Sequence, residues 1–111
     1  MKLMNFSFSA FTAVLALVLI APSAVRAQSA AATYKSKCAG CHGADGKGNT
    51  APAKALGAHD FSSEQVTKES DTNLIAIVTA GKNKMPGYGK SLKEADIKDL
   101  VAYVREVAKQ K

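Results

Sequence analysis

The sequence predicts a small all-α domain in which short helices alternate with long loops. Apolar residues recur at helical spacing in two segments, residues 71–80 and 91–109. The alternation of apolar and polar residues that is typical of half-buried strands is not seen in the sequence. The segments between the helices are rich in glycine and proline, and loops of that length in a small domain need a surface to pack on. These observations predict helices and loops wrapped around a large bound group.

Residues 1–27 resemble an export signal and are set apart from the fold. Lys2 supplies the only early positive charge, residues 10–21 form an apolar run, and "VRA" then offers small residues for cleavage after Ala27. The run is shorter than the roughly 20 residues that span a bilayer as a helix, so a retained anchor is the less favoured alternative. We expect an exported, periplasmic protein with a single domain at residues 28–111. Loss of the signal lowers the formal net charge from +6 to +4.

The first half of the mature chain is expected to hold one helix, one loop and one short helix. Residues 29–39 contain no helix breaker and predict a helix that leads into the first cysteine. Residues 40–57 are rich in glycine and small polar residues, with a bend at Pro52, and predict a loop. Residues 61–68 predict a short helix in which Ser62 and Gln65 form a capping box.

The second half predicts two better-marked helices. Asp71–Ala80 can be capped by Ser70 or Asp71 and is ended by Gly81, and the loop that follows carries Met85. Ser91 and Glu94 predict a capping box at the start of the last helix. Its apolar positions are Ile97, Leu100, Val101, Val104 and Ala108, and it is expected to run to about Lys109. The total is three to four short helices.

The supply of large core residues in the mature chain is small. It has four aromatic residues, Tyr34, Phe61, Tyr88 and Tyr103, and no tryptophan. Domains of this size bury only about 60% of their unfolded surface and usually depend on disulfides, a metal or a bound group. A cofactor in the middle of the fold is therefore expected.

The stretch "CAGCH" contains both cysteines, Cys38 and Cys41, followed by His42. Four interpretations compete: a disulfide, a thioredoxin-like redox pair, part of a zinc site, and covalent attachment of haem. The redox pair belongs after a strand in an α/β fold, and zinc would need a fourth ligand such as the distant His59 or a carboxylate. In a helical turn, cysteines three residues apart share one side and can both reach one edge of a porphyrin. Haem attachment is the favoured interpretation.

The chain resembles the class I c-type cytochromes over nearly all of its mature length. The shared features are a helix leading into "CAGCH", a glycine-rich loop, a middle helix, a loop with Met-Pro, and a C-terminal helix. Tyr34 and Tyr103 stand where that family packs its first and last helices together. The resemblance implies the small cytochrome c fold around one covalently attached haem c, and a one-electron carrier rather than an enzyme. The alternatives are a thiol-disulfide oxidoreductase and a haem sensor or peroxidase with an open sixth site.

The axial ligands of the iron are expected to be His42 and Met85. Met85 is the only methionine left after the signal, and it lies in the loop "MPGYG", which resembles the methionine-ligand segment of the family. The alternatives are a core-filling role for Met85 and ligation by His59. The family also implies that a proline carbonyl, here that of Pro52, accepts the ring N–H of the ligand histidine. Tyr88 and Phe61 are expected near the haem.

The charge pattern favours redox proteins as partners. Lys82, Lys84 and Lys90 bracket the methionine loop and Lys47 follows the attachment motif, so they predict a positive rim that attracts acidic docking surfaces. Ordinary solubilising lysines are the alternative. A monomer with peripheral contact to membrane redox complexes is expected. No nucleic-acid partner is expected, because there is no recognition-helix pattern and acids interleave with the basic residues of the last helix.

Overall fold

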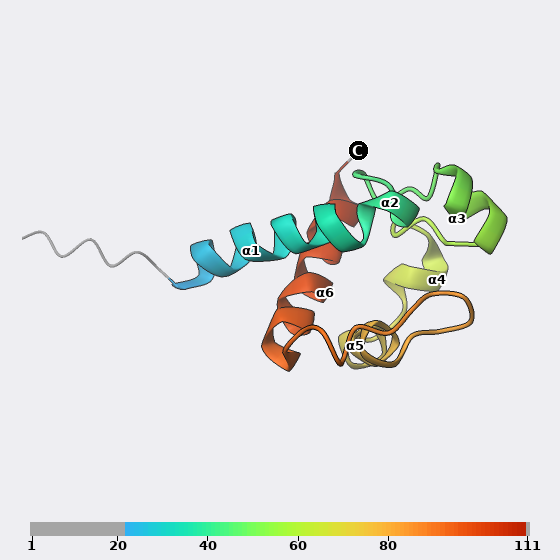
Figure 1. The fold of residues 1–111 in the computed structure, drawn as a ribbon. Coiled ribbons are helices and arrows are strands. Elements are labelled where there is room, and N and C mark those ends of the chain that lie inside the picture. Colours follow the sequence, from blue (N-terminus) through green and yellow to red (C-terminus); the bar gives the residue numbers. More distant parts are fainter. Residues whose placement is uncertain (1–21, 111) are drawn as a thin grey trace, which may run out of the picture.

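The computed structural model describes residues 22–110, and within that range the fold is all-α, as the sequence predicts. It contains six helical segments rather than three to four. They are α1 (Pro22–Lys37), α2 (Ala39–His42), α3 (Ala51–Leu56), α4 (Glu64–Thr67), α5 (Asp71–Ala80) and α6 (Glu94–Lys109). Among the described residues, β-type pairing is limited to one isolated bridge between Lys82 and Met85. Figure 1 shows α1 crossing α6, with the shorter helices and the loop after α5 on one side of that pair.

The crossing of α1 and α6 forms the centre of the core. Tyr34 from α1 is 2% exposed, and its ring centroid lies 5.3 Å from that of Tyr103 on α6. This confirms the predicted aromatic contact between the first and last helices. Leu100 and Val107 of α6 join Tyr34 and Phe61 in one buried cluster. Burial of each large apolar side chain in this cluster stabilises the fold by about 1.5–3 kcal/mol. The crossing of α1 and α6 is therefore the main apolar contribution to folding.

Helix α6 follows its predicted apolar spacing but starts later than predicted. Its buried residues are Ile97, Leu100, Val101 and Val107. The capping box of Ser91 and Glu94 does not form, because the Ser91 hydroxyl donates to the Tyr88 carbonyl instead. Lys93 occupies the N-cap, and the Asp96 carboxylate accepts its backbone N–H at 3.3 Å. The helix therefore begins at Glu94, with an acidic first turn that suits its positive end.

Helix α1 is described from Pro22 onward, so it is already formed before Ser29 and includes the last residues assigned to the export signal. The rest of that signal, residues 1–21, lies outside the described residues, and cleavage after Ala27 stays a prediction. None of the helices within residues 22–110 is both long and apolar enough to cross a membrane.

The predicted loop at residues 40–57 is wrong in part, because it contains α2 and α3. Thr50 caps α3 by accepting the Ala53 N–H at 3.1 Å, Pro52 lies in the first turn, and Gly57 ends the helix with a left-handed φ of 73°. Pro52 therefore starts a helix where a bend was predicted. Ser62 forms no capping box either, since its N–H and hydroxyl both donate to the Asp60 carboxylate and α4 begins only at Glu64.

Helix α5 matches its predicted bounds, and the Ser70 hydroxyl caps it by accepting the Asn73 N–H at 3.1 Å. It is an apolar helix, yet the structure buries none of its residues. Leu74, Ile75, Ile77 and Val78 are all only half-buried. Apolar side chains in this arrangement offer a surface on which a large apolar group can pack.

Arg105 of α6 holds the connection between α4 and α5. Its Nη1 donates to the Val66 carbonyl at 2.9 Å, its Nη2 to the Glu69 carbonyl, and its Nε to the Asp71 carboxylate at 3.0 Å. The fork-shaped guanidinium satisfies three acceptors at once, which a lysine ammonium could not do in the same plane. Arg105 thereby fixes the start of α5 on α6.

Replacement of Arg105 by alanine is expected to lower the free energy of unfolding by about 2–3 kcal/mol, because charged hydrogen bonds to two carbonyls are lost. Thermal unfolding should report a fall in Tm of roughly 10–20 °C for a domain of this size. The matched control is Lys98→Ala, which removes an exposed ion pair with Glu94 and should leave Tm almost unchanged. Equal effects of the two variants would contradict the role given to Arg105.

Candidate functional site

The two cysteines lie on one turn at the junction of α1 and α2. Cys38 is the N-cap of α2, and its carbonyl accepts the N–H groups of Cys41 at 3.2 Å and His42 at 2.9 Å. Both cysteines are free thiols. Burial, with a smaller contribution from Cys41, raises the pKa of the Cys38 thiol despite the opposing charge of Lys37. A thiol-disulfide enzyme needs a lowered thiol pKa, so this site is poorly suited to that chemistry.

Three hydrogen bonds fix the backbone from Cys41 to Gly43. The Thr50 hydroxyl donates to the Cys41 carbonyl, the Gly48 N–H to the His42 carbonyl at 2.9 Å, and the Tyr34 hydroxyl to the Gly43 carbonyl at 2.6 Å. These donors satisfy the carbonyls at the end of α2, which have no partner within so short a helix. The motif is therefore held rigidly between the core and the start of α3.

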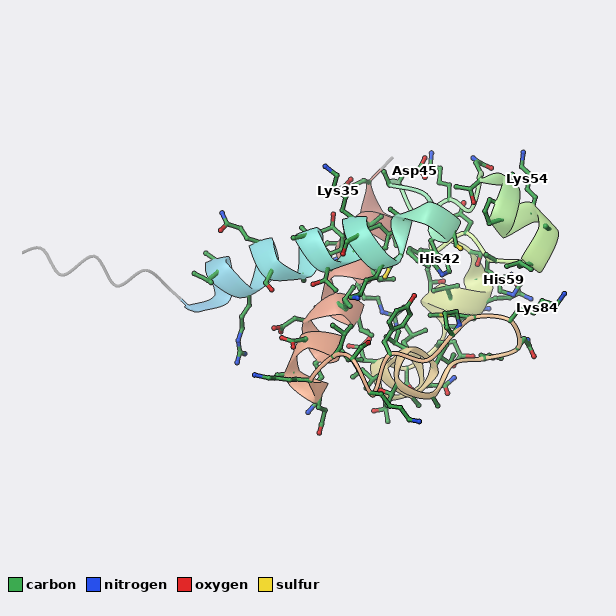
Figure 2. All side chains as sticks on the ribbon, viewed as in Figure 1. Lys35, His42, Asp45, Lys54, His59 and Lys84 are labelled. Carbon is green, nitrogen blue, oxygen red and sulfur yellow. The ribbon has the colours of Figure 1, made fainter. Side chains whose placement is uncertain are left out.

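The ring of His42 lies between the attachment motif and the core. Its centroid is 4.9 Å from that of Phe61, and in Figure 2 it projects from α2 toward the side of α4 and the loop after α5. Burial lowers the pKa of His42, which favours the neutral imidazole that can ligate a metal. Its Nδ1 is buried and has no hydrogen-bond partner. The hydrogen bond expected to the Pro52 carbonyl is thus not formed, and Pro52 is exposed in the first turn of α3.

The loop that carries Met85 is joined to the end of α5 by hydrogen bonds. The N–H groups of Gly81, Tyr88 and Gly89 donate to the carbonyls of Ile77, Val78 and Thr79 at 2.7, 2.8 and 3.0 Å. These carbonyls belong to the last turn of α5 and would otherwise have no partner inside the helix. The apolar helix α5 therefore fixes the methionine loop on its own C-terminal end, as Figure 1 shows.

Met85 is half-buried and closes a tight turn with Lys82. The Met85 N–H donates to the Lys82 carbonyl at 2.9 Å, and the Lys82 N–H donates to the Met85 carbonyl at 3.1 Å. Asn83 between them has a φ of 53°, a left-handed conformation that asparagine tolerates better than most residues. The backbone of Met85 is thus fixed on both sides, while its side chain belongs to no buried cluster.

Gly81→Ala is expected to disrupt this loop. Gly81 has a φ of 82°, and a Cβ there would lie 2.6 Å from the Met85 carbonyl oxygen and 2.8 Å from the Gly87 nitrogen. Left-handed strain costs about 1–3 kcal/mol, and overpacking against backbone adds about 1–3 kcal/mol. The control is Gly57→Ala, with a φ of 73° but no atom within 4 Å of the added carbon. Chemical denaturation should show the larger loss for Gly81→Ala, and equal losses would contradict the close contact.

Tyr88 brings the methionine loop to the cysteines. Its hydroxyl donates to the carbonyl of Lys37, the residue before Cys38, at 3.1 Å. Burial, followed by the nearby thiols of Cys38 and Cys41, raises the pKa of Tyr88. By contrast His59, the rival ligand, is exposed in the loop that follows α3. The structure thus gathers Cys38, Cys41, His42, Phe61 and Tyr88 on one side of the molecule.

The residues of this site fit a haem better than a zinc ion. Within residues 22–110 there is no group of three or more His, Cys, Asp or Glu side chains that could hold a metal alone. The donors available are instead two thiols on one turn, a neutral imidazole with an unpaired nitrogen, and one thioether. The half-buried apolar side chains of α5 offer a further surface that suits a porphyrin ring. Cysteine thiols, imidazole and thioether are the groups that attach and ligate haem in c-type cytochromes.

The positioning roles of Thr50, Gly81 and Tyr88 were not predicted from the sequence, although Tyr88 was expected near the haem. Thr50 could have been recognised from "NTAP", because a threonine shortly before a proline is a typical helix start. The sequence marks Gly81 only as the end of α5, whereas in the structure its missing side chain also lets the methionine loop come close. The contact of Tyr88 with Lys37 joins residues 51 positions apart, and no local pattern predicts it.

Comparison with known proteins identifies the family. The family model described as cytochrome C oxidase, cbb3-type, subunit III matches residues 25–104. Cytochrome c6 of Aphanizomenon flos-aquae is 37% identical over 84 residues, which cover 72% of this chain and 88% of the relative. Cytochrome c6 of Rippkaea orientalis is 35% identical over 89 residues, covering 78% of each chain.

A solved structure agrees with this result. The KustC0563 c-type cytochrome superposes with a TM-score of 0.65 at 30% identity, covering 70% of this chain and 95% of that one. Sequence relatives and structure therefore point to the same fold and the same cofactor, and they confirm the resemblance stated from the motifs. The chain belongs to the class I c-type cytochromes, electron-transfer proteins with covalently attached haem c that exchange electrons with redox partners and are not enzymes.

Proposed function

We propose that this chain is an exported carrier of single electrons whose haem is bound through Cys38 and Cys41 and ligated axially by His42 and Met85. The observation that supports this most strongly is the joining of the methionine loop to the attachment motif by Tyr88. Two segments that are far apart in the sequence, each with one half of the expected ligand set, thereby meet on one side of the fold.

In this proposal the cysteines, the histidine and the methionine each hold the cofactor in a different way. Cys38 and Cys41 fix it covalently, and the neutral imidazole of His42 offers a nitrogen to the iron. The thioether of Met85 is a soft, uncharged donor that favours the reduced metal. Haem bound in this way supplies an iron that cycles between Fe(III) and Fe(II). With His42 and Met85 both holding the iron, no substrate would reach the metal unless Met85 left it, which would suit electron transfer.

The basic side chains around the methionine loop support docking on acidic partners. Lys82, Lys84 and Lys90 are exposed, and Lys47 is exposed in the loop after α2. Figure 2 shows Lys84 and Lys54 extending from the same end of the molecule. A positive rim of this kind speeds encounter with a negatively charged surface, and the rate falls as salt screens the charges. We propose a monomer that forms short-lived complexes with its donor and acceptor.

The proposed cellular location of the protein rests on the predicted export signal. We propose that residues 1–27 direct export and are removed, which leaves residues 28–111 as a periplasmic haem domain. Covalent attachment keeps the cofactor in place after export, because thioether bonds persist where ligand bonds alone would exchange.

The test is to produce the full chain in a bacterial host that attaches haem to exported proteins. The proposal expects a red protein with sharp absorption bands on reduction, and colour that stays with the polypeptide after acid–acetone extraction. It also expects a mature N-terminus at Gln28. A colourless protein with a reducible bond between Cys38 and Cys41 would instead support thiol-disulfide chemistry.

A further inference from the structure

We propose that the hydroxyl of Tyr88 is a strap that keeps Met85 on the iron, so that Tyr88 is a positioning residue for the sixth ligand. The inference rests on the proposed ligation by Met85. It concerns the lifetime of that bond, which ligand identity alone does not determine.

No second hydrogen bond in the described structure joins the methionine loop to the first half of the chain. Within residues 22–110, the bond from the Tyr88 hydroxyl to the Lys37 carbonyl is the single hydrogen bond that links residues 81–92 to residues 22–60. The acceptor closes α1 and directly precedes Cys38. The methionine loop and the attachment motif are therefore linked across the site by one polar contact.

The backbone of Tyr88 is fixed independently of its side chain. Its N–H donates to the Val78 carbonyl at 2.8 Å, and its carbonyl accepts the N–H groups of Ser91 and Leu92 at 3.0 and 2.9 Å. The Leu92 side chain in turn packs against the buried cluster of α1 and α6. Because these contacts survive without the hydroxyl, removal of the hydroxyl alone should loosen the loop from α1 without unfolding it.

The size of the effect follows from the contact that is lost. A neutral hydrogen bond contributes about 1 kcal/mol net, which corresponds to about a fivefold change in an equilibrium. Met85 must leave the iron before an external ligand binds there, and loop opening away from α1 accompanies that step. Loss of the strap should therefore raise the rate of methionine dissociation about fivefold, while the oxidation state of the iron stays the same.

The experiment measures imidazole binding to the oxidised holoprotein by stopped-flow absorption. Imidazole nitrogen replaces the Met85 thioether on Fe(III), and at saturating imidazole the observed rate reports methionine dissociation. Tyr88→Phe keeps the ring and removes the hydroxyl, and it is expected to react about fivefold faster than the wild type. Tyr103→Phe is the matched control, since the Tyr103 hydroxyl makes no hydrogen bond within the described part of the chain and its loss should leave the rate unchanged.

A second control separates the strap from general stability. Ile97→Val removes one methylene from a core side chain of α6 that is 1% exposed, so it should lower Tm without speeding imidazole binding. An equal acceleration in Ile97→Val and Tyr88→Phe, or none in Tyr88→Phe, overturns the strap. If the near-infrared spectrum of the wild type shows methionine ligation but Tyr88→Phe binds imidazole at the wild-type rate, the strap is contradicted and the ligand set is not. If the wild type lacks methionine ligation, the proposed ligand set fails as well.

Discussion

Met85→Ala is expected to lower the reduction potential by on the order of 0.1–0.3 V, within the roughly 0.8 V range that axial ligands span. The thioether is soft and uncharged and stabilises Fe(II), whereas water or hydroxide in its place favours Fe(III). The same change opens the sixth position, so the reduced variant should bind carbon monoxide while the wild type should not. Potentiometric titration and absorption spectra of the reduced protein measure both effects.

The control for Met85 is the rival ligand. His59 is exposed at its loop, so His59→Ala should leave the potential and the carbon monoxide response at wild-type values. A wild-type potential in Met85→Ala together with a large fall in His59→Ala would reverse the assignment of the sixth ligand.

Replacement of both cysteines by serine is expected to abolish covalent attachment of haem completely. Serine cannot form the thioether, and His42 and Met85 alone would hold haem reversibly. The domain should also lose most of its helical signal in circular dichroism, because small domains with few core residues take much of their folding free energy from the bound group. The measurements are the haem left on the polypeptide after acid–acetone extraction and the mass of the intact chain.

Single variants and a matched control sharpen this result. Cys38→Ser and Cys41→Ser should each keep one thioether and therefore retain some haem on the chain. Ala39→Ser adds a hydroxyl between the cysteines while both thiols remain, so haem content should be that of the wild type. Full haem retention in the double variant would contradict attachment through this motif.

The fold was predictable where a single local pattern dominates. The apolar spacing of α6 and the serine cap and terminal glycine of α5 are strong local signals. Helix α5 has its predicted bounds, and α6 forms with its predicted end but begins only at Glu94. Prediction failed where two local signals compete. The glycines and Pro52 predict a loop, whereas the Thr50 cap starts α3 in the same segment. At α6, Ser91 is the predicted cap, but its hydroxyl donates to the Tyr88 carbonyl.

The candidate ligands could be proposed from the sequence, but the residues that hold them could not. Cys38, Cys41, His42 and Met85 are predicted from residue type and motif, and their roles stay predictions. The residues that hold them act through tertiary contacts. Tyr88 reaches Lys37 only because α5 fixes the methionine loop, and Phe61 reaches His42 only because its chain segment folds back on α2. Such contacts depend on the whole fold and leave no local pattern.

The most direct test of the ligand set is the near-infrared spectrum of the oxidised protein, where methionine-ligated ferric haem has a weak charge-transfer band. The proposed site predicts this band in the wild type and in His59→Ala, and its loss in Met85→Ala. Absence of the band from the wild type, or its persistence in Met85→Ala, would contradict a carrier whose iron is held by His42 and Met85.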